Sequence, residues 1–250
     1  MATLGIIGSG NIGTAIARLA VAAGIDVVLA NSRGPESLAG KVAELGERVR
    51  AATPQEAARA GDWVVVSIPL DRYRELPAAE LAGKTVLDTI NYYPIRDGRI
   101  EVLDAEETTT TELVQGHLTG AKLVKAFNNI SAFHIASLAR PAGAADRTAL
   151  PIAGNDPEAN VAAAALIDKL GFDTVDAGSL AETWRFEPET PAYAVAYCAH
   201  PEAMRAFLAD LPNAGPTPSP PDDPGAPLPA GKLRTLLADA HRPPVADRVM

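Results

Sequence analysis

Residues Leu4–Gly13 read LGIIGSGNIG, an apolar run that leads directly into the pattern G-x-G-x-x-G. The apolar start predicts a strand, and residues from about Ile12 to Ala23 predict a helix closed by Gly24. A glycine motif that follows a strand and opens a helix, within a βαβ unit of about 30 residues, indicates a dinucleotide-binding loop. The alternative is a glycine-rich turn without a ligand, and the strand–turn–helix context weighs against it.

Each glycine of this motif has a distinct physical role. Gly8 permits the tight turn, Gly10 lets the backbone approach the pyrophosphate, and Gly13 allows close packing of helix on strand. The free N–H groups at the start of the helix face the negative charge of the phosphates. The cofactor-binding residues predicted in this loop are Gly8, Ser9, Gly10, Asn11, Ile12 and Gly13.

The residues after the second predicted strand, Val27–Ala30, indicate which dinucleotide is bound. NAD sites usually place an Asp or Glu about 20 residues after the glycine loop, where it accepts a hydrogen bond from the ribose 2′-hydroxyl. This chain has Asn31-Ser32-Arg33 there, with no carboxylate. The charge and fork geometry of the Arg33 guanidinium suit a 2′-phosphate, so NADP(H) is the predicted cofactor. A solvated arginine in a turn is the alternative.

The pattern of strands and helices along the rest of the sequence predicts the fold class. Residues 63–68 read WVVVSI, a nearly continuous apolar run typical of a central strand that is buried on both faces. The alternation of strands with helices predicts an α/β protein with a Rossmann-type doubly wound parallel sheet and a smaller C-terminal α/β part. The other predicted strands are Thr85–Asp88, Leu123–Ala126, Leu150–Ala153 and Phe172–Val175.

We predict three segments along the chain. Residues 1–145 form the NADP-binding Rossmann domain, residues 146–211 form a smaller substrate-side domain, and residues 212–250 form a Pro-rich arm with a short terminal helix. The stretch Pro212–Pro229 has too few apolar residues to pack alone, which is typical of a linker or arm.

Composition excludes several classes of function. The net charge of −9 disfavours nucleic-acid binding, which needs clustered Lys and Arg. Cys198 is the one cysteine, and the histidines have no ligand spacing, so no metal site is predicted. No apolar run approaches the length of about 20 residues that spans a bilayer, and no signal peptide is recognised before the glycine loop. We therefore expect a cytoplasmic protein without membrane contact.

The sequence resembles the NADPH:coenzyme F420 oxidoreductase family over roughly residues 3–193. The glycine loop is common to Rossmann proteins in general, whereas the blocks around Ser32-Arg33 and Lys125-Ala126-Phe127-Asn128 are more specific. Similar blocks are the stretches VSIPL at residues 66–70, VLDT at residues 86–89 and IAGND at residues 152–156.

The resemblance implies direct hydride transfer between the nicotinamide and a second ring, a deazaflavin such as coenzyme F420. It implies that Ser32 and Arg33 hold the 2′-phosphate, with Asn31 beside them among the cofactor-binding residues, and that the region of Asn128 faces the second ring. Ile68, Pro69 and Leu70 would line the ribose–nicotinamide side. A homodimer is the expectation for the family. The longer C-terminus and the loop Asn91–Gly98 depart from the compact family members.

An acceptor that is a carbonyl or an imine would need a proton donor near the nicotinamide. The candidates are Tyr92, Tyr93, Lys125 and His134. The two tyrosines follow the end of a strand, where open α/β sheets bind ligands, although packing of the loop is an equally good interpretation. Lys125 lies in an apolar strand and is as well explained by a structural ion pair. His134 lies among apolar residues, which favours a packed or solvent-facing position.

Three functions stay open on the sequence. The first is an NADP(H)-dependent oxidoreductase that uses a deazaflavin. The second is an NADPH-dependent reductase of a small imine, enamine or carbonyl metabolite, suggested by the loop Asn91–Gly98. The third is a non-catalytic NADP(H)-binding protein that engages a partner through its Pro-rich arm.

Overall fold

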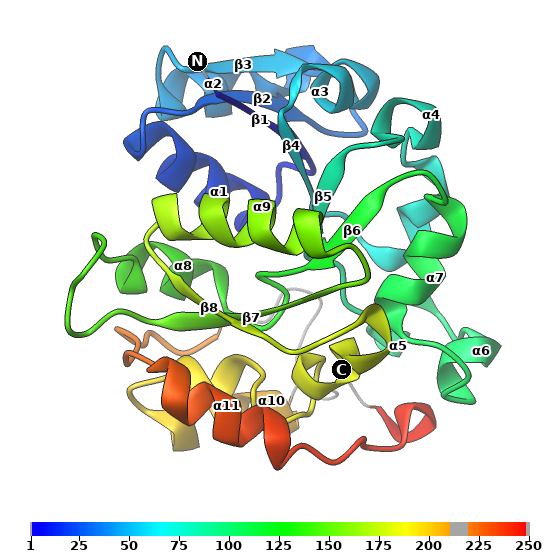
Figure 1. Ribbon diagram of the computed structural model, residues 1–250, viewed down its shortest axis with the longest axis vertical. Coiled ribbons are helices and arrows are strands. Elements are labelled where there is room, and N and C mark those ends of the chain that lie inside the picture. The colour runs from blue at the N-terminus through cyan, green and yellow to red at the C-terminus, as the bar shows by residue number, and fades with distance from the viewer. Residues whose placement is uncertain (1, 211–219, 249–250) are drawn as a thin grey trace.

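One sheet of eight strands, in the order β3-β2-β1-β4-β5-β6-β7-β8, forms the centre of the protein (Figure 1). The computed structural model describes residues 2–210 and 220–248. Neighbouring strands are parallel except β6 and β7, which are antiparallel. The doubly wound sheet predicted from the sequence is confirmed. The strands are β1 (Thr3–Ile7), β2 (Asp26–Ala30), β3 (Val49–Ala52), β4 (Trp63–Val66), β5 (Thr85–Asp88), β6 (Lys122–Lys125), β7 (Ala149–Gly154) and β8 (Asp173–Asp176).

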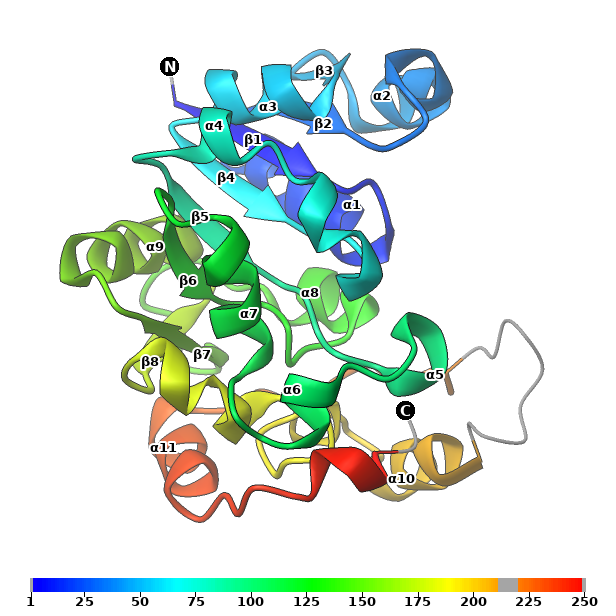
Figure 2. The ribbon, with the colours of Figure 1, turned by 90° about the vertical axis from the view of Figure 1, so that its right-hand side faces the viewer.

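Helices lie on both faces of the sheet (Figure 2). The α-helices are α1 (Asn11–Ala22), α2 (Ala39–Leu45), α3 (Pro54–Ala60), α4 (Ala78–Leu81), α5 (Pro94–Asp97), α6 (Glu101–Asp104), α7 (Thr110–His117), α8 (Ala132–Leu138), α9 (Pro157–Lys169), α10 (Pro201–Asp210) and α11 (Ala230–Ala238). Short 3₁₀ helices are η1 (Pro35–Leu38), η2 (Leu70–Glu75), η3 (Leu180–Phe186), η4 (Ala194–Tyr197) and η6 (Val245–Asp247).

Two hydrophobic cores flank the sheet because successive residues of a strand point to opposite faces. Ile6 belongs to the core that contains the buried residues of α1, α8 and α9, whereas its neighbour Ile7 belongs to the core beneath α3 and α7. Burial on both faces explains why the central strands are apolar at nearly every position.

The edges of the sheet depart from the sequence prediction. β3 was not predicted from the sequence, because a four-residue edge strand with the exposed Arg50 gives little apolar signal. The sheet continues past residue 146, since Val124 of β6 pairs with Gly154 of β7.

Within the predicted arm, residues 211–219 lie outside the described residues. Leu228 is buried, and its carbonyl accepts a hydrogen bond from the Ala149 N–H at 2.8 Å. The end of the arm therefore packs on β7.

Candidate functional site

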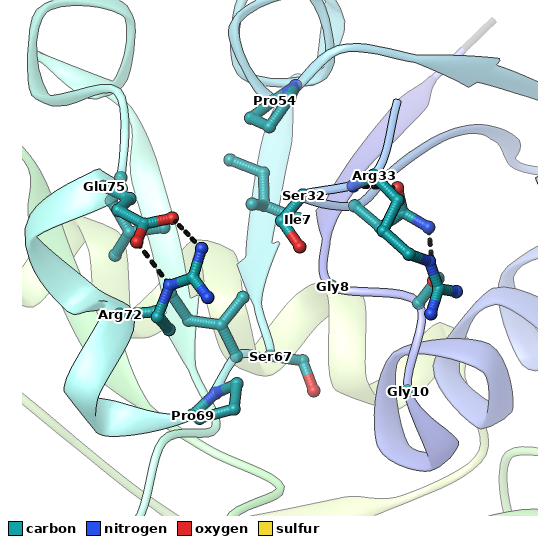
Figure 3. Close-up of a pocket in the computed structure, with 14 residues that line it drawn as sticks. Ile7, Gly8, Gly10, Ser32, Arg33, Pro54, Ser67, Pro69, Arg72 and Glu75 are labelled. Atoms are coloured by element: carbon teal, nitrogen blue, oxygen red, sulfur yellow. Dashed lines mark hydrogen bonds and ion pairs between the residues drawn. The ribbon is translucent and has the colours of Figure 1, made fainter. Parts of the chain in front are cut away.

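A cavity of about 370 Å³ lies at the carboxyl ends of β1, β2 and β4 (Figure 3). We call it the nucleotide pocket. The order of strands reverses between β1 and β4, and open α/β sheets bind ligands at such a switch point. It is lined by Ile7, Gly8, Ser9, Gly10, Asn31, Ser32, Arg33, Pro54, Ser67, Ile68, Pro69, Arg72, Glu75 and Leu76.

The glycine loop has the geometry of a phosphate cradle. Gly8 has a φ of +120°, and a Cβ there would overlap the carbonyl oxygen of Ser67. A Cβ at Gly13 would overlap the carbonyl oxygen of Gly8, so the turn packs tightly on α1. A Cβ at Gly10 would meet nothing within 4 Å, and Gly10 caps α1 without a side-chain hydrogen bond. The open space above Gly10 and the uncapped helix start fit a pyrophosphate.

Asn31 organises the loop that follows β2. Its Oδ1 accepts a hydrogen bond from the N–H of Arg33 at 2.9 Å, and its Nδ2 donates to Ser37 Oγ at 2.9 Å. The Nδ2 also lies 3.4 Å from Ser9 Oγ, which ties this loop to the glycine loop. Within the part of the chain that the structure describes, the Arg33 guanidinium forms no hydrogen bond or ion pair. A free cation is thus held at the pocket, as a 2′-phosphate requires.

A second cavity, of about 340 Å³, adjoins the first and shares Ser67, Ile68 and Pro69 with it. We call it the acceptor pocket. It lies where the glycine loop, the ends of β5 and β6 and the segment before η4 meet. It is lined by Asn11, Ile12, Ser67, Ile68, Pro69, Thr89, Asn91, Tyr93, Arg96, Phe127, Asn128, Ile130, Ser131, Tyr193 and Ala194.

Two tyrosine hydroxyl groups meet at the wall of the acceptor pocket. Tyr93 OH and Tyr193 OH form a hydrogen bond with each other, and Asn91 Nδ2 donates to Tyr93 OH at 3.2 Å. The Arg96 guanidinium lies over the Tyr93 ring, 4.8 Å from its centroid. Burial, followed by the neighbouring Tyr93, raises the pKa of Tyr193 well above its ordinary value. Tyr193 is therefore neutral and able to donate a hydrogen bond.

The acceptor pocket also contains strained backbone. Phe127 has a φ of +57° and Ala194 a φ of +23°, although neither is glycine. The Ala194 N–H donates to the carbonyl of Asn129 at 2.9 Å, which helps to hold this conformation. The buried Oδ1 of Asn128 has no hydrogen-bond partner in the described structure. Strain and unpaired polar atoms cluster at ligand-binding sites, and their presence here supports a ligand in this pocket.

The predicted site residues separate into two groups. Eleven of the thirteen predicted cofactor-binding residues line one of the two cavities, whereas Gly13 and Leu70 line neither. Leu70 is fully buried in the core beneath α3, so it supports the pocket from behind. Gly13 packs against the glycine turn. Asn128 lines the acceptor pocket, where its Nδ2 donates to the carbonyl of Phe186 at 2.9 Å.

Tyr93 is the one catalytic candidate that lines either cavity. Tyr92 is fully buried; its hydroxyl donates to Asp104 Oδ1 at 3.0 Å and accepts from the Ile100 N–H at 3.0 Å. Burial raises the pKa of Tyr92. Tyr92 therefore anchors the segment that contains α5 and α6. Successive side chains of an extended chain point to opposite sides, so Tyr92 is buried while Tyr93 lines the acceptor pocket.

Lys125 forms a buried ion pair. Its Nζ lies 3.4 Å from Asp88 Oδ2 and donates to the carbonyl of Ile90, and both charged side chains are fully buried. Thr111 Oγ1 donates to the same carboxylate oxygen at 2.8 Å. These contacts join the ends of β5 and β6 and match the structural interpretation of Lys125.

His134 is buried beside Asp223, with Nε2 and Oδ1 3.1 Å apart. Burial lowers the pKa of His134, and the hydrogen bond to Asp223 offsets this only in part. Cys198 Sγ lies within 4.8 Å of these ligand atoms. The Asp223 carboxylate also accepts from the N–H groups of Ala199, His200 and Gly225. These protein groups already occupy the lone pairs of the Asp223 carboxylate. The cluster therefore serves as a polar contact that joins α8 to the arm.

Sequence reasoning did not identify Pro54, Arg72, Glu75, Leu76, Arg96 or Tyr193 as pocket residues. Pro54 belongs to the capping box of α3, and Arg96 lies in the loop Asn91–Gly98, but neither context identifies a pocket residue. The other four belong to no local motif, and tertiary packing brings them to the site. The stretch VSIPL at residues 66–70 was the nearest signal to Arg72 and Glu75, because η2 follows it directly.

These features define a Rossmann-type protein with one pocket at the glycine loop and a second pocket that adjoins it. The chain belongs to the family described as NADP oxidoreductase, coenzyme F420-dependent, whose family model matches residues 3–92. The hypothetical protein SMa0349 of Sinorhizobium meliloti is similar to it at 34% identity, with a TM-score of 0.65 over 78% of this chain and 94% of that one.

Two further proteins are similar to this chain. A structure from Arthrobacter sp. FB24, provisionally described as an F420-dependent NADP reductase, has 26% identity and a TM-score of 0.60, over 72% of this chain and 86% of that one. The Escherichia coli K12 protein YjhV is 41% identical over 70 residues, which are 27% of this chain. The match spans 48% of YjhV, about half of its length. Among the described residues, no helix is long and apolar enough to cross a membrane.

Proposed function

We propose that this NADP oxidoreductase transfers a hydride between NADP(H) and a deazaflavin such as coenzyme F420. The observation that carries the proposal is the continuity of the two pockets, which share Ser67, Ile68 and Pro69. A nicotinamide that extends from the nucleotide pocket along these residues would meet an acceptor in the acceptor pocket. The family description and the Arthrobacter structure support a deazaflavin as that acceptor.

The residues have the following roles in this proposal. The backbone N–H groups at the start of α1 bind the pyrophosphate, and Ser32 and Arg33 bind the 2′-phosphate. Ile68 and Pro69 line the ribose–nicotinamide side. NADP(H), when bound, supplies or accepts a hydride at its nicotinamide ring. Hydride transfer between two rings depends on positioning and exclusion of water, which the apolar residues of the acceptor pocket provide. These are Ile12, Ile68, Pro69, Phe127 and Ile130.

An absorbance experiment tests the acceptor. Purified protein is mixed with NADPH and oxidised deazaflavin, beside samples that contain flavin or no acceptor. The proposal predicts rapid bleaching of the deazaflavin that depends on both protein and NADPH. Bound NADPH without bleaching would contradict the deazaflavin assignment while leaving the nucleotide site intact.

The tyrosine pair favours a second candidate, an NADPH-dependent reductase of a small imine, enamine or carbonyl compound. Each hydroxyl has one proton, so the hydrogen bond between Tyr93 and Tyr193 leaves one proton for a third partner. In such a reduction the hydride adds to the carbon of the C=N or C=O bond. The nitrogen or oxygen then takes the remaining hydroxyl proton, which water replaces.

Three phenylalanine variants test this candidate. Tyr93→Phe and Tyr193→Phe are expected to lower turnover of a cyclic imine or a carbonyl compound without weakening NADPH binding. Tyr92→Phe is the matched control, because its hydroxyl is bonded to Asp104 away from both pockets. Turnover that is unchanged in Tyr93→Phe and Tyr193→Phe would exclude the pair as the proton donor.

A further inference from the structure

The wall of the nucleotide pocket opposite Arg33 carries a second arginine. Arg72 and Glu75 lie on η2, and Figure 3 shows them across the pocket from Arg33. Arg72 binds the Glu75 carboxylate with two nitrogens: Nη2 donates to Oε2 at 2.7 Å, and Nε donates to Oε1. This fork-to-fork contact fixes the plane of the guanidinium. Both side chains stay about half exposed and are open to a ligand.

The two arginines differ in whether a neighbouring carboxylate neutralises their charge. The side chain of Arg33 has no ionic partner among the residues that the structure describes, whereas the charge of Arg72 is neutralised by Glu75. A 2′-phosphate carries close to two negative charges and is bound best by the free cation. A carboxylate beside the phosphate would oppose binding. The Arg72–Glu75 pair is therefore suited to a neutral part of the nucleotide.

The remaining space indicates which part this is. The pyrophosphate is held at the glycine loop and the 2′-phosphate at Arg33, so the adenine ring occupies the rest of the pocket. That space is bounded by the apolar groups of Ile7, Pro54 and Leu76 and by the Arg72–Glu75 pair. A planar guanidinium packs well on an aromatic face.

We propose that the Arg72–Glu75 pair binds the adenine ring, and that it contributes equally to the affinity for NADPH and for NADH. Discrimination between the two cofactors is then left to the 2′-phosphate contacts of Ser32 and Arg33. The assignment rests on the nucleotide-binding part of the proposed function and is independent of the acceptor.

Calorimetric titration with NADPH, NADH and 2′,5′-ADP tests the assignment without any turnover. The double variant Arg72→Gln/Glu75→Gln removes the guanidinium plane and keeps the net charge. We expect about three- to fivefold weaker binding of NADPH and NADH alike, with an unchanged ratio between them. Arg59→Gln/Glu80→Gln is the matched control, because Arg59 and Glu80 form an Arg–Glu pair outside the pocket. It should leave every affinity unchanged.

The single variant Arg72→Gln sharpens the test, because it leaves Glu75 as an unpaired carboxylate beside the nucleotide. It should weaken NADPH more than NADH, and adding Glu75→Gln should restore the ratio. A double variant that loses NADPH selectively would overturn the assignment by placing Arg72 on the 2′-phosphate. Unchanged affinities would overturn it as well. Wild-type protein that binds no NADPH would refute the nucleotide site itself, whereas normal binding without deazaflavin reduction would refute only the acceptor.

Discussion

The side-chain oxygen of Asn31 accepts a hydrogen bond from the backbone N–H of Arg33 at 2.9 Å. The same side chain reaches Ser37 and Ser9, so one residue joins the β2 loop to the glycine loop. The guanidinium that is expected to choose the cofactor is thus carried on a backbone turn tied to the phosphate cradle. The residues proposed for cofactor choice and for phosphate binding are therefore tied together through the side chain of Asn31.

Replacing Arg33 should change cofactor choice. Arg33→Ala removes a charge-assisted contact to the 2′-phosphate, so NADPH should bind about 10- to 100-fold more weakly while NADH is little affected. Dissociation constants from quenching of protein fluorescence would measure this. Equal weakening of both cofactors would contradict the role of Arg33.

Gly10 and Gly13 should respond to alanine in different ways. A methyl group at Gly10 meets no protein atom within 4 Å, so Gly10→Ala should keep the melting temperature and weaken NADPH binding. A methyl group at Gly13 overlaps the Gly8 carbonyl, so Gly13→Ala should cost about 1–3 kcal/mol of stability. Thermal unfolding and NADPH titration separate the two effects. A Gly10→Ala variant with wild-type affinity would argue against a pyrophosphate at this turn.

Lys125 should matter for stability. Lys125→Met leaves the buried Asp88 carboxylate without its cation and should cost about 3–5 kcal/mol in the free energy of unfolding. Arg18→Met breaks the exposed pair with Glu44 and serves as the control, with an expected loss below about 1 kcal/mol. Urea denaturation compares them. A stable Lys125→Met variant that has lost only activity would return Lys125 to the catalytic candidates.

His134 should make stability depend on pH. Its pKa is lowered by burial in the folded protein, so the unfolded chain binds the proton more tightly. The stability from the neutral imidazole is therefore present above the ordinary pKa of 6.5 and is lost as the pH falls below it. His134→Gln keeps a hydrogen-bond donor near Asp223 and should flatten the decline between about pH 7 and pH 5. Equal slopes in both proteins would show that another group titrates.

The fold and the part of the site formed by the glycine loop and the β2 loop can be predicted from the sequence, because their signals are local. The glycine loop, Asn31 and Arg33 lie within one βαβ unit, whose order along the chain is its order in space. Tyr193 and Arg72 gave no such signal. Tyr193 reaches Tyr93 across 100 positions of sequence, and the exposed Arg72 differs from a surface arginine only by its place at the pocket.

Deuterium transfer tests hydride transfer to a deazaflavin most directly. NADPH that carries deuterium at the transferring C4 position is mixed with the protein and oxidised deazaflavin in ordinary water, and the reduced product is examined by mass spectrometry. Direct transfer between the adjoining pockets predicts one deuterium on the product carbon. Reduced deazaflavin without deuterium, or no reduced deazaflavin at all, would contradict it.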